Sequence, residues 1–533
     1  MGVKPMINAT AVIAEWNASE EDWLARAVSP WSDKCFPDLV LAPGDGPAAD
    51  QPAVIYRDKV WSHRELAAAV HSAARNLVGW HKVRPRETVM LKMENSDLFI
   101  IAYLAVHRAG ATAIPLNPKL TDHEVRYMVG DSSPALMLVA DASAISHELK
   151  ASVPIVVASE LLSQHNGCAV QPLPQVSPDD IATIFYTSGT TGAPKGVIHT
   201  HRTLITGAFQ NCRGWGYEGR GSVTLAMTPL FHIAAHSWFY PVLANEGTLI
   251  VDTFGTERAL ELITRHKVDG FGAVPAMLLM LMDHPSRSAY DLRSIRNIRF
   301  GASSIPPERI SLLRTVFPNA RLFHGMGQTE SGGTISVLPD EYAVSKLGSS
   351  GFPIPGVSVR IVDDQGQVVQ RGVPGEIIAK GPHVMVGYLN QREATNRTLQ
   401  DGWLFTGDVG IMDDDGMVMI VDRKKDMIIR GGENIYSTEV ENVYLSHPQI
   451  KQCAVVGVPD PLLQETVAAV IVTEAEPDAS LREALIAFGK ERLAPFKIPA
   501  RWFFTSSLPC TATGKIQKQL IRDAVSGANL TEF

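Results

Sequence analysis

The chain has 533 residues, of which 45% are hydrophobic and 20% are charged. This length exceeds what one hydrophobic core usually organises, so at least two domains are expected, and the composition excludes collagen-like, coiled-coil and wholly disordered proteins. The 48 basic residues are outnumbered by 56 acidic residues, and the net charge of -8 offers no overall field that would attract nucleic acid or an anionic membrane. Any phosphate site must be built locally.

The first fifty residues are rich in Pro, Asp and Ala, and the run 43–47 is typical of a linker. We expect residues 1–50 to form an N-terminal extension over the surface of a globular body that begins near Ala53. The start lacks the apolar core of a secretion signal, and the apolar tract 98–114 is too short and polar to span a bilayer. Five cysteines without CxxC spacing suggest neither a zinc site nor a disulfide scaffold. A cytoplasmic location fits best.

From Glu65 onward, apolar runs rich in Val and Ile alternate with helical patterns. Helices are predicted over 65–78, 97–109, 123–129, 257–266 and 276–283, and strands over 88–93, 111–116, 135–139, 181–186, 248–252, 270–274 and 295–301. This alternation predicts an α/β fold with largely parallel sheets.

The pattern changes twice in the second half of the chain. From about Gly351 short strands alternate with Gly, Pro and Asp turns, which predicts a β-rich subdomain over 351–424 within a large N-terminal domain, 51–424. The tail, 425–533, has the length of one small α+β domain. The polar run 422–426 before it is either a hinge or an ordinary solvated charge run.

A phosphate loop is predicted directly after the strand 181–186. The segment from Tyr186 to Val197 contains four aliphatic hydroxyls, three glycines and one lysine. Glycines let backbone N–H groups approach an anion, hydroxyls add donors, and Lys195 adds a mobile positive charge. The segment does not match the Walker pattern, and its composition alone is equally compatible with a plain surface loop.

This loop closely resembles the signature of the adenylate-forming superfamily, which contains acyl-CoA synthetases, nonribosomal-peptide adenylation domains and beetle luciferases. Six further segments match in family order: 227–232, 301–304, 324–330, 403–408, 422–435 and 509–516. The resemblance covers essentially everything after residue 50. It implies a large N-terminal adenylation domain of α/β subdomains with a β-rich subdomain, and a small, mobile α+β C-terminal domain.

The resemblance also implies a nucleotide site. Its members would be Thr187, Ser188, Gly189, Thr190, Thr191, Gly192, Lys195, Gly301, Ala302, Ser303, His324, Gly325, Met326, Gly327, Gln328, Thr329, Asp408, Ile420, Arg423 and Lys515. Asp408 would accept hydrogen bonds from the ribose hydroxyls, and Arg423 would contact ribose or phosphate. Gly325 and Gly327 would let the flat adenine lie against the backbone.

Catalytic roles follow from the same resemblance. They would fall to Lys515, Lys195, Thr190, His232 and Glu330, with Glu330 and Thr190 as ligands of Mg²⁺. Lys515 would bridge the carboxylate and the α-phosphate. The C-terminal domain would then turn about a hinge at Lys425, and Gly431, Gly432 and Glu433 would contact CoA.

The implied reaction has two steps. A carboxylate attacks the α-phosphate of Mg-ATP to give an acyl-adenylate and pyrophosphate, and the thiol of CoA then displaces AMP. One alternative acceptor is the phosphopantetheine of a carrier protein. A second alternative is a non-catalytic nucleotide-binding scaffold on the same fold. The protein would act as a monomer or a homodimer.

The acid itself is less closely defined. Amino-acid-selecting relatives place an Asp after the gate segment, whereas residues 231–238 contain no carboxylate, so an α-amino acid is not expected. The expected acyl pocket is lined by His232, Ala234, His236, Trp238, Gly301, Gly327 and Gly333. Trp238 should shorten this cavity, while Gly332 and Gly333 should open space on its other side. Short aryl, branched and medium-chain acids all remain open.

Three local patterns receive other interpretations. Gly325 and Gly327 lack the third glycine of a dinucleotide fingerprint, which argues against a dehydrogenase. His199 and His201 have no carboxylate or cysteine partners nearby in sequence and are expected to be ordinary loop residues, not metal ligands. His232 is either part of a gate beside the acyl site or a satisfied core histidine.

Overall fold

The computed structural model describes residues 34–163, 172–187, 194–215, 221–301, 305, 307–346, 348–473, 479–510, 516–527, 530 and 532. The chain forms two compact units: unit 1 comprises Met1–Val359 and Ala379–Phe405, and unit 2 comprises Arg360–Ile378 and Thr406–Phe533. Much of the segment expected as the β-rich subdomain thus packs with unit 2. The division into packed units does not test the position of the predicted hinge. The domain boundary between residues 424 and 425 therefore stays a prediction.

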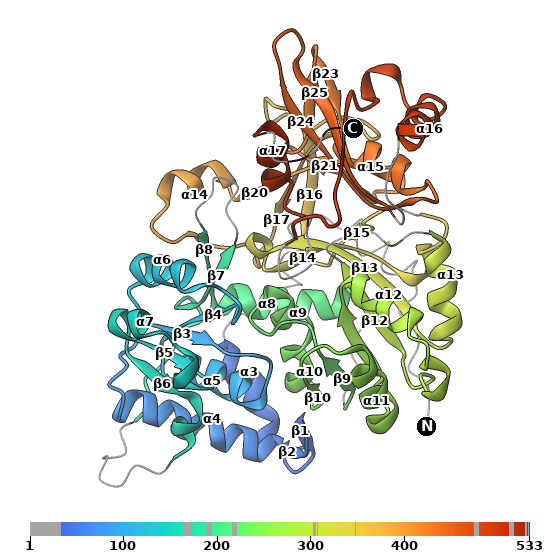
Figure 1. The fold of residues 1–533 in the computed structure, drawn as a ribbon. Helices are drawn as coiled ribbons and strands as arrows, with labels where there is room; N and C mark the ends of the chain where they lie inside the picture. The colour runs from blue at the N-terminus through green and yellow to red at the C-terminus, as the bar shows by residue number, and fades with distance from the viewer. Residues whose placement is uncertain are drawn as a thin grey trace. The chain divides into compact units, whose positions relative to one another are not determined.

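The largest sheet of unit 1 has nine strands (Figure 1). In spatial order they are β15 (Phe352–Pro353), β14 (Gly333–Leu338), β13 (Arg321–Gln328), β12 (Asn297–Gly301), β11 (Gly270–Ala273), β9 (Val223–Ala226), β10 (Thr248–Val251), β1 (Pro52–Tyr56) and β2 (Lys59–Ser62). The pairs from β13 to β1 are parallel, and the edge pairs are antiparallel.

A second sheet of unit 1 has seven strands. They are β18 (Gly387–Tyr388), β8 (Lys195–Thr200), β7 (Ile181–Thr187), β4 (Thr112–Leu116), β3 (Thr88–Lys92), β5 (Leu136–Val139) and β6 (Ile155–Val157). Strands β7, β4, β3, β5 and β6 are parallel, and β8 and β18 add antiparallel pairs. The predicted α/β architecture with largely parallel sheets is confirmed.

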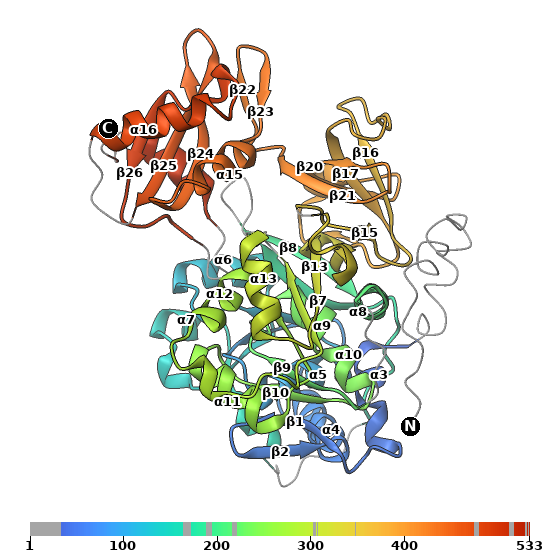
Figure 2. The same ribbon diagram turned by 90° about the vertical axis from the view of Figure 1, so that its right-hand side faces the viewer.

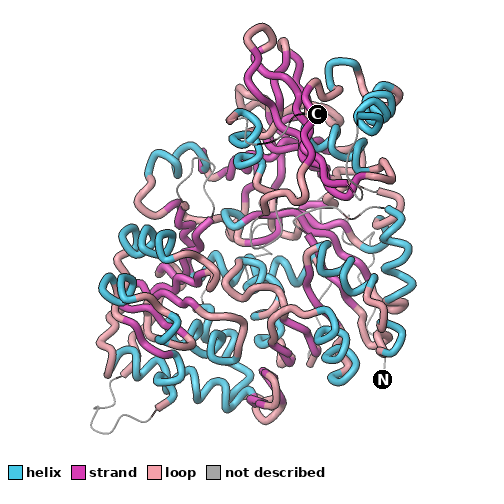
Figure 3. The backbone as a smooth tube through the Cα atoms, viewed as in Figure 1, coloured by secondary structure: helices cyan, strands magenta, loops and turns pink. Residues whose placement is uncertain are grey.

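Helices cover these sheets (Figure 3). They are α3 (Phe36–Leu41), α4 (His63–Gly79), α5 (Asp97–Arg108), α6 (Asp122–Ser132), α7 (His147–Ser152), α8 (His201–Gly214), α9 (Ile233–Trp238), α10 (Tyr240–Ala244), α11 (Thr256–His266), α12 (Pro275–Asp283), α13 (Pro307–Val316) and α14 (Arg392–Thr398). Capping boxes at Ser62 and Thr121 fix the starts of α4 and α6. Helices α11, α12 and α13 lie along the nine-stranded sheet (Figure 2). Their apolar side chains form one core with those of the sheet.

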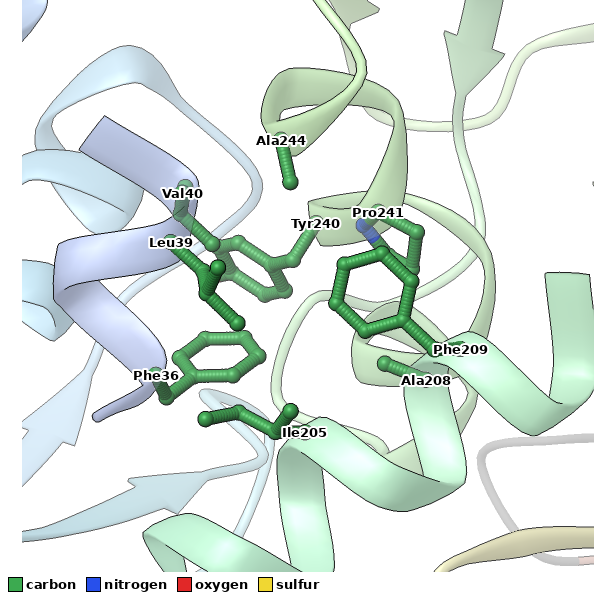
Figure 4. A pocket seen from close by; sticks show the side chains of 9 residues that line it. All are labelled: Phe36, Leu39, Val40, Ile205, Ala208, Phe209, Tyr240, Pro241 and Ala244. Carbon is green, nitrogen blue, oxygen red and sulfur yellow. The ribbon is translucent and has the colours of Figure 1, made fainter. Parts of the chain in front are cut away.

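The segment after Lys34 corrects the expectation of a surface extension. Phe36 and Val40 of α3 are 2% exposed and belong to the core that joins both sheets of unit 1. Between α3, α8 and α10 lies an apolar cavity of about 10 Å³, lined by Phe36, Leu39, Val40, Ile205, Ala208, Phe209, Tyr240, Pro241 and Ala244 (Figure 4). That volume is about one water molecule, too small for a substrate. Pro37 and Asp38 lie in the first turn of α3, and Pro43 and Asp45 lie in the 3-10 helix that follows, so these residues belong to packed helices and do not mark a linker.

A five-stranded sheet includes the predicted β-rich segment. Its strands are β16 (Ser358–Val362), β17 (Gly375–Lys380), β20 (Trp403–Met412), β19 (Leu399–Gln400) and β21 (Val418–Arg423). The chain passes from one unit to the other within β16, β17 and β20.

The last sheet belongs wholly to unit 2. Its strands are β23 (Glu433–Ile435), β22 (Ile428–Arg430), β25 (Gln464–Thr473), β24 (Ile450–Asp460) and β26 (Arg501–Phe504), with helices α15 (Ser437–Leu445), α16 (Ala479–Lys490) and α17 (Lys518–Ser526). One core lies under α15 and α16, and another lies under α17. The small α+β C-terminal fold is confirmed.

Candidate active site

The predicted phosphate loop lies at the turn between β7 and β8. Thr187, at the end of β7, is the cross-strand partner of Lys195, at the start of β8, so the two strands hold both ends of the loop together. Five predicted members of the loop, Ser188, Gly189, Thr190, Thr191 and Gly192, lie outside the described residues. A strand that runs directly into a loop rich in glycine and hydroxyls is the arrangement that phosphate binding requires.

Lys195 and Glu330 are brought together through Tyr388, which the sequence analysis missed. Lys195 Nζ lies 4.9 Å from the centre of the Tyr388 ring, and the Tyr388 hydroxyl donates a hydrogen bond of 2.9 Å to Glu330 Oε1. Burial and the Glu330 carboxylate raise the pKa of Tyr388, so the phenol keeps its proton and remains a donor. No sequence motif flags Tyr388, because its partners come from β8 and from the turn after β13.

Glu330 suits a magnesium ion held mainly by a substrate. Mg²⁺ is usually bound through one or two carboxylates together with substrate phosphates. Among the described residues there is no cluster of three or more His, Cys, Asp or Glu side chains that could enclose a metal by itself. The Glu330 carboxylate, oriented by the Tyr388 hydroxyl, has the chemistry of such a ligand, and its role in Mg²⁺ binding stays a prediction.

The histidines at the β8–α8 junction correct a prediction. His199 and His201 are buried residues of a strand and a helix, not loop residues. His199 Nε2 lies 2.8 Å from the Thr329 carbonyl, which can only accept, so this nitrogen donates. Burial lowers the pKa of His199 to about 4 and that of His201 to about 4, so both are neutral near pH 7. His199 thereby positions the residue before Glu330.

The glycines at the ends of β12 and β13 are needed for packing. A Cβ on Gly301 would stand 2.4 Å from the Gly325 carbonyl oxygen, and one on Gly325 would stand 2.7 Å from the Trp215 ring. A Cβ on Gly327 would stand 1.8 Å from the Gly333 oxygen. Protein atoms lie at these positions, so the glycines permit close strand packing, and the expectation that adenine lies against this backbone stays a prediction.

The remaining residues expected around the nucleotide lie in both units. In unit 1, His324 stacks on Phe300 at 5.2 Å, Met326 is buried, and Gln328 ends β13; Ala302 and Ser303 lie outside the described residues. In unit 2, Asp408 and Arg423 are cross-strand partners on β20 and β21, and their side chains form an ion pair of 3.1 Å. Ile420 on β21 is 39% exposed.

Unit 2 also holds the predicted hinge and CoA residues. The Lys425 carbonyl accepts a hydrogen bond of 3.5 Å from Arg522 of α17. Gly431 and Gly432 have φ of 60° and 87° and form the two-residue turn between β22 and β23, with Glu433 exposed after it. Positive φ at both positions accounts for the glycines as a hairpin turn, so the role in CoA binding stays a prediction.

Lys515 itself lies outside the described residues. The residues beside its loop are paired: Cys510 and Ile516 form an antiparallel bridge, and Gln517 N donates to the Pro509 carbonyl at 2.8 Å.

The expected acyl pocket centres on α9. His232 is its exposed N-cap and accepts a hydrogen bond from Ala234 N at 3.3 Å, while His236 is buried with Nδ1 3.1 Å from the Tyr103 hydroxyl. The segment before α9 is held by Asn95, which bonds the Thr228 carbonyl at 3.0 Å and the Leu230 amide at 2.8 Å. Asn95, which no sequence motif indicates, therefore holds the gate segment in place.

Trp215 and Trp238 lie along one side of the expected acyl pocket. The Trp238 ring lies where a Cβ on Gly272 would stand, 1.9 Å from Cε3, and meets the Trp215 ring edge to face at 5.8 Å. Gly332 does not open space as expected, because a Cβ there would stand 2.4 Å from the His383 carbonyl oxygen. At Gly333 the neighbours are the side chains of Ser237 and Asn211.

The glycine- and hydroxyl-rich sequence between β7 and β8, the contacts of Lys195, Tyr388 and Glu330, and a separate C-terminal unit are the features expected of an enzyme that activates an acid with a nucleotide. The family model of the AMP-binding enzymes matches residues 45–389, and that of the AMP-binding enzyme C-terminal domain matches residues 439–515. The chain belongs to this family, the AMP-binding enzymes of the adenylate-forming superfamily.

Relatives of known activity are CoA ligases. The 2-succinylbenzoate–CoA ligase of Bacillus subtilis (strain 168) is 34% identical over 478 residues, which cover 89% of this chain and 95% of that protein. Feruloyl-CoA synthase of Amycolatopsis sp is 35% identical over 450 residues, 83% of this chain and 89% of that protein. The solved Bacillus subtilis o-succinylbenzoate CoA synthetase with its acyl-adenylate has a TM-score of 0.83 at 32% identity, covering 92% of this chain and 98% of that chain.

The reaction class is therefore that of an AMP-forming acid–thiol ligase. The enzyme activates a carboxylic acid with ATP to an acyl-adenylate, releases pyrophosphate, and transfers the acyl group to CoA with release of AMP. The enzyme uses ATP as its nucleotide, Mg²⁺ as its metal ion and CoA as its thiol substrate. The scaffold alternative is excluded. Within the described parts of the chain, none of the helices has the length and apolar character needed to cross a membrane.

Proposed function

We propose that the acid activated by this enzyme is small and bears no α-ammonium group. The observation that carries this proposal is the packing of Trp238, whose indole is fixed between Gly272 and Trp215 and so limits the depth of the acyl site. No carboxylate occurs in residues 231–238 to pair with an ammonium group. A bulky fixed ring favours short or compact acids over long chains.

In the first step, we assign to Lys515 the stabilisation of the negative charge that develops between the acid's carboxylate and the α-phosphate of ATP. A carboxylate oxygen forms a bond to the α-phosphorus while the bond from that phosphorus to pyrophosphate breaks. A cation beside the phosphorus stabilises the charge spread over its oxygens. Lys195 and Thr187 to Gly192 would hold the β- and γ-phosphates, and Asp408 and Arg423 would hold the ribose.

Glu330, with Thr190, would hold the magnesium ion, which neutralises phosphate charge when bound. This chain's own contribution is the orientation of the Glu330 carboxylate by the Tyr388 hydroxyl at 2.9 Å. His199 supports the same turn through the Thr329 carbonyl. A carboxylate held in one rotamer loses less entropy on binding than a free one.

In the second step the CoA sulfur forms a bond to the acyl carbon, the bond from that carbon to AMP breaks, and the thiol proton leaves. We assign the turn Gly431–Gly432 with Glu433 to the pantetheine arm, after a rotation about Lys425. His232, at the exposed N-terminus of α9, would lie beside the acyl carbonyl. A carrier-protein phosphopantetheine is the alternative acceptor, because it presents the same thiol.

We further propose a cytoplasmic monomer or homodimer. The four described cysteines, Cys35, Cys212, Cys453 and Cys510, are free thiols, which suits a reducing compartment. Size-exclusion chromatography with light scattering would give the oligomeric state directly.

The test is acid-dependent exchange of labelled pyrophosphate into ATP, followed by AMP release with CoA alone. A panel of benzoates, cinnamates and fatty acids of two to twelve carbons, plus α-amino acids, should give exchange with small acids and none with amino acids. Trp238→Ala should move the optimum toward larger acids. Exchange only with long-chain or amino acids, or an unchanged optimum in Trp238→Ala, would contradict the proposal.

A further inference from the structure

His199 is a buried histidine that contacts the turn carrying Glu330. It lies on β8, the strand that begins at Lys195, and its side chain is 0% exposed. Its Nε2 lies 2.8 Å from the carbonyl oxygen of Thr329, a residue 130 positions away in the sequence. Thr329 is buried as well, so its carbonyl depends on this partner for a hydrogen bond that water does not replace.

The second ring nitrogen fixes the orientation of the His199 ring. Nδ1 lies 3.1 Å from Thr203 Oγ1 of α8, and burial lowers the pKa of His199 to about 4, so the ring is neutral near pH 7 and carries one N–H. A carbonyl can only accept, which assigns that hydrogen to Nε2. Nδ1 is then left to accept from the Thr203 hydroxyl, which can instead donate to the Thr200 carbonyl at 3.1 Å. His199 therefore gives Thr329 its single donor.

Two further hydrogen bonds hold the same turn from the segment before and within β18. The Met385 amide donates to the Glu330 carbonyl at 2.9 Å, and the Tyr388 hydroxyl donates to Glu330 Oε1 at 2.9 Å. The backbone on both sides of the Glu330 amide and the Glu330 carboxylate thus each have a partner from another part of the chain.

These partners converge on strand β8. Strand β18, which carries Tyr388, pairs antiparallel with β8, and His199 lies on β8 itself. The same strand begins at Lys195, directly after the predicted phosphate loop. One strand therefore connects the end of the phosphate loop to both supports of the turn that carries Glu330.

We propose that His199 is a positioning residue for the adenylation step: through the Thr329 carbonyl it holds Glu330 in a fixed position relative to the phosphate loop. This inference rests on the proposed function, in which Glu330 binds Mg²⁺. In this role His199 touches neither ATP nor the acid. Groups that bind a metal and a substrate together must be held within about 0.5 Å of the productive geometry, and a buried ring bonded at both nitrogens supplies that restraint.

Two substitutions of similar size test the donor separately from the space that the ring fills. His199→Gln keeps an N–H that can reach the Thr329 carbonyl, whereas His199→Met has the same length and no donor. In acid-dependent pyrophosphate exchange, His199→Met should lower kcat/KM for Mg-ATP at least about tenfold, the range typical of a lost partner around a metal site. It should also raise the Mg²⁺ concentration for half-maximal rate and leave KM for the acid unchanged. His199→Gln should recover most of both effects.

Nucleotide binding without acid gives a readout that does not depend on turnover. Isothermal titration calorimetry with ATP, once with Mg²⁺ and once with EDTA, measures how much the metal strengthens nucleotide binding. In His199→Met this gain should be about tenfold smaller than in the wild type, while the affinity for metal-free ATP stays the same. The matched control is His63→Met, which replaces another buried histidine, 2% exposed, at the start of α4. It should leave the gain from Mg²⁺ unchanged.

Glu330→Gln separates two failures. If it leaves the Mg²⁺ dependence unchanged, the proposed magnesium ligand is wrong. If Glu330→Gln alters that dependence and His199→Met does not, the role of His199 is overturned while the proposed function stands. An equal defect in His199→Gln and His199→Met, or in His63→Met, would also overturn it, because the donor to Thr329 would not be the cause. If His199→Met does not fold, His199→Asn decides, since its shorter amide does not reach Thr329.

Discussion

Two groups of buried polar side chains, one in each unit, differ in their hydrogen-bond partners. In unit 1, around α8, α9 and β14, Asn211, Ser237 and Trp215 have polar atoms that bond none of the described residues. In unit 2, Asp422 on β21 accepts hydrogen bonds from the backbone and hydroxyl of Ser437 and from Thr438. The paired charged groups of unit 2 suit a structural connection between elements, whereas these polar atoms of unit 1 hold no element to another by hydrogen bonds.

The network in unit 2 continues beyond Asp422. Lys518 Nζ donates to Ser437 Oγ at 2.6 Å and forms an ion pair with Glu441 at 2.7 Å, and Glu441 accepts from the Val455 amide at 2.7 Å. The Lys518 and Glu441 side chains are only 12% and 13% exposed. These contacts join β21, α15, α17 and β24. Burial of a polar group alone therefore does not mark a ligand site, because these buried groups pair with one another.

Lys518→Met gives the largest expected effect. It leaves Glu441 buried without its cation, and removal of one partner from a buried pair typically costs about 3–5 kcal/mol. Urea unfolding followed by Trp502 fluorescence in a variant with other tryptophans replaced should show this loss. Lys518→Met with Glu441→Gln, which keeps an acceptor for Val455, should recover part of it. Equal stability of wild type and Lys518→Met would contradict the structural role.

Lys515→Ala, in the same unit as Lys518→Met, should affect catalysis and not stability. This variant should keep the stability of unit 2 but slow adenylation about 10²- to 10³-fold, since it removes one preorganised charge at the transition state. Single-turnover assays started with acid and ATP, and separately with purified acyl-adenylate and CoA, measure the two steps. Thioester formation from supplied adenylate should survive. Equal loss in both assays would argue against rotation about Lys425.

Acid should destabilise unit 1 through its buried histidines. Burial lowers the pKa of His199 and His201 to about 4, below about 6.5 in the unfolded chain, so the unfolded state binds the proton first as pH falls. The stability from each is complete above pH 6.5 and is lost toward pH 4, about 3 kcal/mol per histidine. Urea midpoints between pH 8 and 5 give the slope.

The control for this slope is a histidine on the surface. His201→Gln should flatten the pH dependence by up to one proton, while Gln at the exposed His123 should leave it unchanged. A slope unaffected by His201→Gln would show that this histidine is already protonated in the folded state.

The strands at 88, 112, 248, 270 and 297 could be predicted almost to the residue, because each is a short, mostly apolar run next to helical patterns. Helix α3 could not, since Pro and Asp dominate its surroundings and only tertiary burial of Phe36 reveals it. The phosphate loop and Glu330 stand out as local motifs. Tyr388 does not, because its contacts with Lys195 and Glu330 join segments far apart in sequence.

Tyr388→Phe has the smallest expected effect. Tyr388 is a buried residue of unit 1 whose hydroxyl does have a hydrogen-bond partner. The change removes the 2.9 Å bond to Glu330 but keeps the ring beneath Lys195. A hydrogen bond to a carboxylate contributes about 1.5 kcal/mol, so kcat/KM for Mg-ATP should fall about tenfold. Because the lost bond orients the carboxylate expected to meet magnesium, the Mg²⁺ concentration for half-maximal rate should rise, while KM for the acid should not. Tyr388→Leu, which also removes the ring, should lose more through Lys195. Wild-type Mg²⁺ dependence in both variants would show that the contacts among Lys195, Tyr388 and Glu330 are structural. Tyr388 would then have the same kind of role as the paired polar residues around Asp422 in unit 2.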